Sequence, residues 1–231
     1  MTTAIAILAK APAPGRVKTR LVPPLTPEEA AAVARACLDA TLRRIAPAVD
    51  APITLFLDGE PDGALRALAE SLGVGIVPQI GVDLGARLEG AFGSLRRGGA
   101  TKTVALGSDS PTIDPAWISR AIASLDTHDI VIGPSEDGGY YLIGLRAEVP
   151  ELFRDIPWGT DGVAGATLAR ASNLGLAIDV LPAWYDVDDI ATLRRALADG
   201  AEHFPTSIHR LVDARSSVIT EPTPPSPSPA R

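Results

Sequence analysis

Short apolar runs alternate along the chain with longer segments that carry apolar residues at a helical spacing. Short runs rich in β-branched residues predict buried strands, and apolar residues repeating every three or four positions predict helices. The expected strands cover residues 3–9, 53–57, 75–78, 103–106, 129–133, 140–145 and 177–181. The expected helices cover residues 27–45, 61–72, 84–97, 115–125, 161–174 and 188–198. This alternation predicts a three-layer α/β/α fold with a mostly parallel sheet.

Local signals support two details of this prediction. Thr26 offers an N-cap hydroxyl, Pro27 suits the first helical position, and Glu29 completes a capping box. The strands at 129–133 and 140–145 adjoin across a glycine-containing turn, which predicts an antiparallel hairpin in the otherwise parallel sheet. Because such sheets bind ligands at the carboxyl ends of their strands, we expect the chemistry in the loops that follow them.

Composition limits the class of protein. The 231 residues are 46% hydrophobic and 21% charged, as in folded globular proteins. We expect one domain over residues 1–213 and a disordered Pro- and Ser-rich tail over residues 214–231. The apolar runs are shorter than the roughly 20 residues that span a bilayer, and no basic segment precedes the first of them. These features predict a cytoplasmic protein, and the single cysteine, Cys37, leaves no partner for a disulfide within the chain.

The basic residues are concentrated near the start of the chain. A net charge of −7 argues against nonspecific binding of nucleic acid, which needs a basic face. Four cations nevertheless precede the first acidic residue, in the loop that contains Gly15: Lys10, Arg16, Lys18 and Arg20. Side chains of this kind bind phosphate oxygens, although a solvated basic loop has the same composition. The loop is neither a Walker loop nor a GxGxxG fingerprint, so recognition would rest on side chains.

Aspartates follow the later strands. Asp109, in the segment GSDSP, comes at the end of an expected strand, where a carboxylate can hold Mg²⁺ or Mn²⁺. A turn before Pro111 is the alternative interpretation of the same residue. Asp186 and Asp188 would lie on one side of an extended segment and meet one ion, whereas helix capping by Asp188 or Asp189 is the competing interpretation.

A second acidic pair precedes two glycines. Glu136 and Asp137 lead into Gly138 and Gly139, which either form an ordinary hairpin turn or place the carboxylates over an acceptor pocket. The sequence contains no GxSxG elbow, and its three histidines lack metal-ligand spacing. We therefore expect no covalent nucleophile.

Five segments together resemble the nucleotide-diphospho-sugar transferase superfamily, which includes GT-A glycosyltransferases and nucleotidyltransferases: AKAPAPGRVKTRL, DLGARL, GSDSP, EDGGYYLIGL and WGTD. The resemblance covers most of residues 3–200. More narrowly, the segments are similar to a bacterial transferase family found near radical-SAM, selenium and arsenosugar genes. The basic loop, the strand-end aspartate and the late DVD also resemble 2-phospho-lactate and molybdenum-cofactor guanylyltransferases. The loop is rich in proline where sugar nucleotidyltransferases have glycines, and GSDSP departs from the DxD motif of glycosyltransferases.

The resemblance implies a set of site residues. Those expected to bind the nucleotide and its phosphates are Lys10, Gly15, Arg16, Lys18, Arg20, Asp83 and Ser108. Those expected at the acceptor pocket are Gly138, Gly139, Tyr140, Trp158, Thr160 and Asp161. The expected metal ligands for Mg²⁺ or Mn²⁺ are Asp109, Asp186 and Asp188. The expected catalytic residues are Lys18, Asp109, Glu136 and Asp137.

These observations favour a metal-dependent transferase. The leading hypothesis is nucleotidyl transfer, in which NMP passes from an NTP to a small phosphorylated acceptor and pyrophosphate is released. The cations, which exceed what a metal-bound diphosphate needs, favour this reaction over glycosyl transfer from an NDP-sugar, which stays the alternative. A catalytically silent nucleotide-binding or partner-binding protein is a third hypothesis. We expect neither nucleic acid nor a membrane as partner, and the base, the acceptor and a homodimer are left open.

Overall fold

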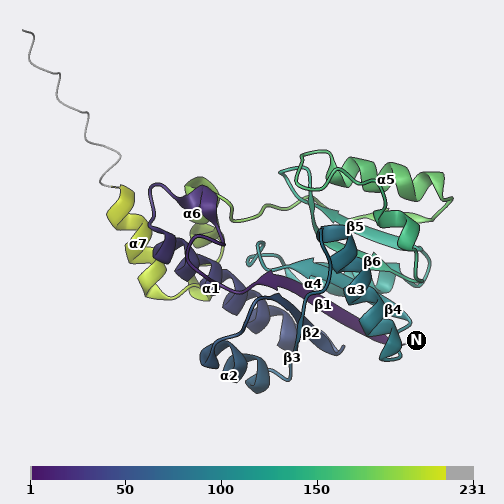
Figure 1. Ribbon diagram of the computed structural model, residues 1–231, viewed down its shortest axis with the longest axis horizontal. Helices are drawn as coiled ribbons and strands as arrows, with labels where there is room; N and C mark the ends of the chain where they lie inside the picture. The colour runs from purple at the N-terminus through teal and green to yellow at the C-terminus, as the bar shows by residue number, and fades with distance from the viewer. Residues whose placement is uncertain (1, 217–231) are drawn as a thin grey trace, which may run out of the picture.

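The computed structural model describes residues 2–216, whose centre is a seven-stranded sheet in the order β3-β2-β1-β4-β6-β5-β7 (Figure 1). The strands are β1 (Thr3–Lys10), β2 (Ile53–Asp58), β3 (Gly75–Pro78), β4 (Lys102–Gly107), β5 (Ile130–Pro134), β6 (Tyr140–Leu145) and β7 (Ile178–Val180). β6 runs antiparallel to β4 and β5, and the other neighbours are parallel. The predicted mixed sheet and its late hairpin are therefore confirmed.

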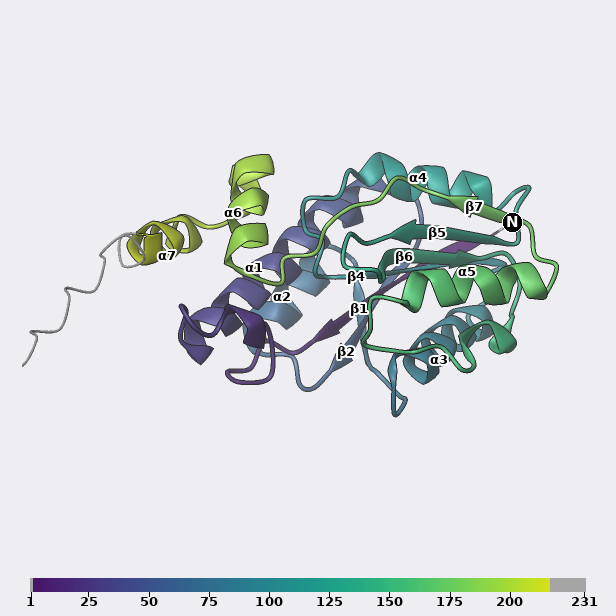
Figure 2. The ribbon, with the colours of Figure 1, turned by 90° about the horizontal axis from the view of Figure 1, so that it is seen from above.

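Helices cover both faces of the sheet. They are α1 (Pro27–Ile45), α2 (Gly63–Ser71), α3 (Leu84–Arg97), α4 (Pro115–Ser124), α5 (Val163–Asn173), α6 (Ile190–Asp199) and α7 (Thr206–Ser216), with short 3-10 turns η1 (Thr19–Leu21), η2 (Ala46–Ala48), η3 (Pro150–Phe153) and η4 (Ala201–His203). Figure 2 shows α1 and α4 on one face and α3 and α5 on the other, as a three-layer fold requires. None of the helices in the described part of the chain is long and apolar enough to cross a membrane.

The alternation of side chains along each strand builds two cores. In β1, Ile5 and Ile7 are fully buried against the layer that contains α1, α2 and α4. Their neighbours Ala4 and Ala6 face α3 and α5 instead. Because β1 is apolar on both faces, it is most stable at the centre of the sheet, where helices on both sides keep its side chains from water.

A third apolar cluster lies beyond the sheet. It joins η1 and the first half of α1 to a helical cap, which we define as α6, η4 and α7. Figures 1 and 2 show α6 and α7 at one end of the molecule, beside the start of α1. Cys37 is buried in this cluster, and burial raises the pKa of its thiol to about 12. The thiol is therefore protonated at neutral pH and unsuited to act as a nucleophile.

The cap extends past the expected end of the domain. Helix α7 was not expected from the sequence, and the predicted boundary after residue 213 falls inside it. Its residue Arg215 donates a hydrogen bond from Nη2 to Oε1 of Glu29, at 2.7 Å, which joins the end of α7 to the first turn of α1. The rest of the predicted tail, residues 217–231, lies outside the described residues.

Candidate active site

A cleft of about 670 Å³ opens at the carboxyl ends of the parallel strands. Its walls come from the loops after β1, β3 and β4, from the start of the antiparallel β6, and from residues 159–163. It brings together most of the predicted site residues: Lys10, Arg16, Lys18, Arg20, Ser108, Asp109, Asp137, Gly139, Tyr140, Thr160, Asp161, Asp186 and Asp188. Because these residues are far apart in the sequence, their shared location comes from the order of the strands.

The basic loop is shaped by a tight turn. The N–H of Arg16 donates to the carbonyl of Ala13 at 3.1 Å, and Gly15 adopts φ 74° at the third position of the turn. Pro14 followed by glycine suits a turn of type II, in which the third residue needs a positive φ. Gly15 therefore shapes the loop and directs the side chains that follow it. Lys18 also has a positive φ, 48°, which is uncommon for a residue other than glycine.

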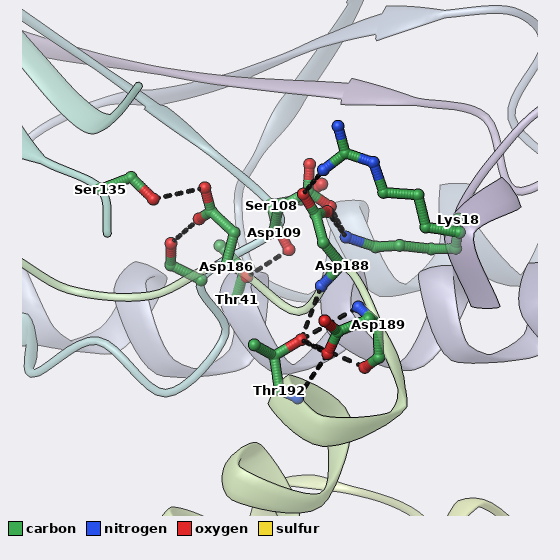
Figure 3. A network of polar contacts seen from close by, with 11 residues as sticks. Lys18, Thr41, Ser108, Asp109, Ser135, Asp186, Asp188, Asp189 and Thr192 are labelled. Atoms are coloured by element: carbon green, nitrogen blue, oxygen red, sulfur yellow. Dashed lines mark hydrogen bonds and ion pairs between the residues drawn. The ribbon is translucent and has the colours of Figure 1, made fainter. Parts of the chain in front are cut away.

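Lys18 is the centre of a charged network at the cleft (Figure 3). Its Nζ forms an ion pair with Asp109 and lies 3.5 Å from Oδ1 of Asp188. Arg20 reaches the other oxygen of Asp188, with 3.2 Å between Nη1 and Oδ2. The Lys18 side chain is only 5% exposed, whereas that of Asp109 is 54% exposed. Burial alone would lower the pKa of Lys18, but the carboxylates of Asp109 and Asp188 outweigh it and raise that pKa above its ordinary value.

Asp186 belongs to a different network from Asp188. The hydroxyls of Ser110 and Ser135 both donate to its carboxylate, the second at 2.8 Å (Figure 3). Burial raises the pKa of Asp186, and the nearby carboxylates of Asp109 and Asp137 raise it further, against the effect of the two hydroxyls. The backbone turns between the two aspartates, since the N–H of Asp188 donates to the carbonyl of Asp186 at 3.1 Å. The segment is therefore not simply extended, and the two carboxylates face different partners.

The residue that caps α6 is the neighbour of a predicted metal ligand. Asp189 is the N-cap of α6, where its Oδ1 accepts a 2.8 Å hydrogen bond from the N–H of Thr192. Asp188 is thereby left to face Lys18. In the described range, 2–216, no three His, Cys, Asp or Glu side chains are arranged to hold a metal ion. The three aspartates expected to bind one ion have different partners. Two serines donate to Asp186, while Asp109 and Asp188 both contact the ammonium of Lys18.

The wall on the β6 side is locked by a close backbone approach. Gly138 has φ 89°, and a Cβ atom there would lie 2.0 Å from the carbonyl oxygen of Asp161. The carbonyl of Gly138 also accepts a 2.9 Å hydrogen bond from the N–H of Ala164 at the start of α5. Only glycine fits this position, because both the positive φ and the contact exclude a side chain. Gly138 thus joins the loop that carries Asp137 to the loop that carries Asp161.

Aromatic side chains support the same wall. The rings of Tyr140 and Trp158 meet edge to face, with 6.5 Å between their centroids. Trp158 also packs closely on Gly85 of α3, where an added Cβ would lie 2.9 Å from the indole. Trp158 therefore packs against Tyr140 and restricts the orientation of its ring.

Two predicted residues lie outside the cleft lining and contact other parts of the fold. Glu136 points toward the cap, where its Oε2 accepts a 2.8 Å hydrogen bond from Nη1 of Arg195, and it is not among the residues that line the cleft. Arg195 in turn lies 3.8 Å from the centroid of the Tyr185 ring. Asp83 caps α3 by accepting a 2.8 Å hydrogen bond from the N–H of Ala86. The acidic pair therefore divides, with Asp137 at the cleft and Glu136 on the cap, and Asp83 orients a helix.

Sequence reasoning missed two lining residues on the β3 side, Gln79 and Arg87. Gln79 directly follows β3, at the edge where ligands bind, and Arg87 lies inside the segment DLGARL. The strand-end rule could have identified Gln79. Arg87 lies inside α3, away from the end of any strand, so the strand-end rule does not identify it.

Residues 41–160, more than half of the chain, match a family described as an uncharacterized protein conserved in bacteria (DUF2064). The chain belongs to this family. It is also 29% identical, over 141 residues, to a phosphoenolpyruvate guanylyltransferase from Chloroflexus aggregans, a match that covers 59% of this chain and 68% of the relative.

Solved structures extend the likeness to nearly the whole chain. A protein from Desulfovibrio desulfuricans G20 assigned to the nucleotide-diphospho-sugar transferases has a TM-score of 0.82 and 29% identity, covering 94% of this chain and 98% of that one. A CMP-2-keto-3-deoxy-manno-octonic acid synthetase in complex with CTP has a TM-score of 0.57 at 15% identity, with 88% and 100% covered. Rv0371C from Mycobacterium tuberculosis H37Rv, in complex with manganese, has 0.52 at 22%, with 85% and 98% covered. The last two show the fold alone. Together the comparisons confirm the GT-A-like superfamily and a transferase.

Proposed function

We propose that the chain is a nucleotidyltransferase that moves NMP from an NTP to a small phosphorylated acceptor. The observation that carries the proposal is the network of Lys18, Asp109 and Asp188, which places a fixed ammonium and two carboxylates in one cleft. Lys10, Arg16 and Arg20 line the same cleft. The likeness to a guanylyltransferase supports this reaction and favours GTP as the donor.

In the proposed reaction an acceptor phosphate oxygen attacks the α-phosphorus of the NTP. The bond from the α-phosphorus to the bridging oxygen breaks, and its electron pair leaves with pyrophosphate. An acceptor phosphate that is already ionised needs no general base, so Asp137 has no proton to remove. The chain's own contribution is electrostatic, because Lys18 and the basic loop stabilise negative charge that spreads over the phosphate oxygens. Asp109, on the loop after β4, holds Lys18 at the cleft when no metal ion is bound.

The residues present fit a divalent cation. Asp109 and Asp188 converge on the ammonium of Lys18, so their oxygens already meet at a point that accepts positive charge. Mg²⁺ is commonly held by one or two carboxylates together with substrate phosphates, so two carboxylates suffice. We propose Asp109 and Asp188 as the ligands of Mg²⁺ or Mn²⁺, with Asp186 behind them on its two serines. When bound, the ion would neutralise charge on the phosphates.

Glycosyl transfer from an NDP-sugar is the second candidate. Two observations favour it: the likeness to a protein assigned to the nucleotide-diphospho-sugar transferases, and the carboxylates of Asp137 and Asp161 on the acceptor side of the cleft. Such carboxylates suit the hydroxyl groups of a sugar, whereas an anionic acceptor would meet them with repulsion. The two reactions release different products, so one assay separates them.

The test incubates the purified chain with Mg²⁺ and with each NTP or NDP-sugar in turn. Parallel samples contain phosphoenolpyruvate or a pool of phosphorylated metabolites, and products are identified by mass spectrometry. Nucleotidyl transfer predicts pyrophosphate and an NMP-bearing product only when acceptor is present, with both lost in Asp109→Asn. Release of NDP from an NDP-sugar, without turnover of any NTP, would instead establish the glycosyltransferase.

A further inference from the structure

The end of the cleft formed by β3 and α3 carries polar side chains that the proposed phosphate chemistry leaves without a role. Gln79 and Arg87 line this end, together with the apolar Leu84 and Leu88. Leu84 is 43% exposed, so it offers an uncovered apolar surface beside the two polar groups. A pocket with apolar side chains and a few fixed polar groups is the usual composition of a site for a small-molecule ring system.

Gln79 is held in one orientation by the neighbouring strands. Its Nε2 donates to the carbonyl of Ala9 at 2.7 Å and to that of Phe56 at 2.9 Å, at the ends of β1 and β2. Both amide hydrogens are therefore engaged. Its Oε1 accepts a 3.3 Å hydrogen bond from Nη1 of Arg87, and a carbonyl oxygen can accept a second. Gln79 can consequently act toward a ligand only as an acceptor.

Arg87 is fixed from the opposite side. Its Nη1 lies 2.9 Å from Oδ2 of Asp58, and its Nε donates to the carbonyl of Gly81 at 3.3 Å. Within residues 2–216, its Nη2 donates no hydrogen bond. A quarter of the side chain is exposed, and the residue lines the cleft. Arg87 therefore keeps one amino group for a ligand, in a guanidinium whose plane is already set.

We propose that Gln79 and Arg87 read the base of the nucleotide and select a 6-oxopurine, guanine. The inference rests on the proposed function and adds the residues that decide the donor. Arginine donates to the 6-oxo edge of guanine, and the free Nη2 of Arg87 can supply one such bond to O6, while the glutamine pairing with adenine needs a free amide donor. Gln79 has no such donor left, but its Oε1 suits the N1–H or 2-amino group of guanine. Leu84 and Leu88 would cover the plane of the ring.

The test measures binding, without any acceptor, by isothermal titration of the full chain with nucleotides and Mg²⁺. The wild type is titrated with GTP, ITP, ATP and CTP. ITP lacks the 2-amino group, and ATP lacks the 6-oxo group, so these analogues probe Gln79 and Arg87 without any substitution. Arg87→Lys keeps the charge and loses the planar fork, and Arg97→Lys, an exposed arginine later in α3, is the matched control.

We expect the wild type to bind GTP roughly tenfold more tightly than ATP, through single bonds from Arg87 to O6 and from the base to Gln79, with ITP between them. Arg87→Lys should lose most of its affinity for GTP and little for ATP, and Arg97→Lys should bind as the wild type does. Equal losses for every nucleotide in a folded Arg87→Lys, or a wild type that binds all four alike, would overturn the inference and leave the proposed function standing. A wild type that binds no nucleotide would overturn both.

Discussion

The ammonium of Lys18 and the carboxylate of Asp109 form an ion pair that joins the loop after β1 to the loop after β4. β1 and β4 are neighbours in the sheet, so their carboxyl ends bring these loops together. The lysine is almost completely buried, while the aspartate stays more than half exposed to the cleft. The carboxylates of Asp109 and Asp188 raise the pKa of Lys18 although burial alone would lower it, so the buried lysine keeps its charge.

Removing the ammonium tests whether Lys18 and a metal ion share the same carboxylates. We expect Lys18→Met to bind Mn²⁺ more tightly than the wild type when no nucleotide is present, because Asp109 and Asp188 lose their cation. Transfer activity should fall at least tenfold, because the charge on the phosphates is no longer neutralised. Electron paramagnetic resonance of free Mn²⁺ measures the binding. Lys102→Met is the control, since Lys102 is equally buried and pairs with Asp126 away from the cleft. Equal Mn²⁺ affinity in the wild type and Lys18→Met would contradict the assignment of the ligands.

Gly138 should tolerate no side chain. Gly138→Ala would place a methyl group against the carbonyl of Asp161 as well as straining a positive φ, so we expect a loss of about 2 kcal/mol or more in the free energy of unfolding. Gly175→Ala is the matched control, because Gly175 also has a positive φ, 69°, but has open space around its Cβ position. Urea denaturation of both variants separates the two effects. A Gly138→Ala variant that is no less stable than Gly175→Ala would show that the loops move apart freely.

Glu136 should act through Arg195. We expect Glu136→Gln and Arg195→Gln to raise the KM for the acceptor by similar factors of a few fold, with the KM for the nucleotide unchanged. The double variant should be no worse than either single one, because both substitutions break the same contact. Asp137→Asn, which changes a residue of the cleft wall, is the comparison and should act independently of both. A Glu136→Gln variant that loses kcat while Arg195 is intact would instead support the predicted catalytic role of Glu136.

The contact between α1 and α7 gives a pH-dependent contribution to stability. The pKa of Glu29 is lowered, chiefly by the N–H of Thr26, with a further contribution from Arg215. Because the folded pKa lies below the unfolded one, the stabilisation is complete above the ordinary value of about 4.3 and is lost as pH falls through the folded pKa. Glu29→Gln should therefore be less stable than the wild type at pH 7, with the gap closing as pH falls below about 4.

Unfolding free energies at pH 7 and pH 3.5 measure this gap. Glu28→Gln, an exposed neighbour in the same helical turn, is the control and should show a smaller difference at pH 7. A gap for Glu29→Gln that widened at low pH would reverse the sign of the argument.

Local patterns were sufficient to predict the layers of this fold. The apolar run of β1 and the Thr26–Glu29 capping box each determine an element from adjacent residues, and both are confirmed. Helix α7 could not be predicted in the same way, because it depends on packing against α1 and on the contact of Arg215 with Glu29. Its own sequence has a weak apolar pattern, so its partner decides its structure.

The candidate site shows the same difference between what local sequence predicts and what distant contacts decide. The loops after β1 and β4 could be assigned to one edge from strand order, and the cleft contains both Lys18 and Asp109. The direction of individual side chains could not be predicted: Glu136 and Asp137 are adjacent, yet one meets Arg195 and the other lines the cleft. The same holds for Asp186 and Asp188, because the turn between them depends on contacts with distant serines and Lys18.

The most direct test of the central claim is ³¹P nuclear magnetic resonance of the wild type and Asp109→Asn with Mg²⁺, GTP and a pool of phosphorylated metabolites. Nucleotidyl transfer predicts that the wild type produces pyrophosphate and a new resonance for an α-phosphate bonded to the acceptor, in equal amounts. Asp109→Asn should give neither. If the wild type yields no pyrophosphate from GTP, or if Asp109→Asn yields as much as the wild type, the account is contradicted.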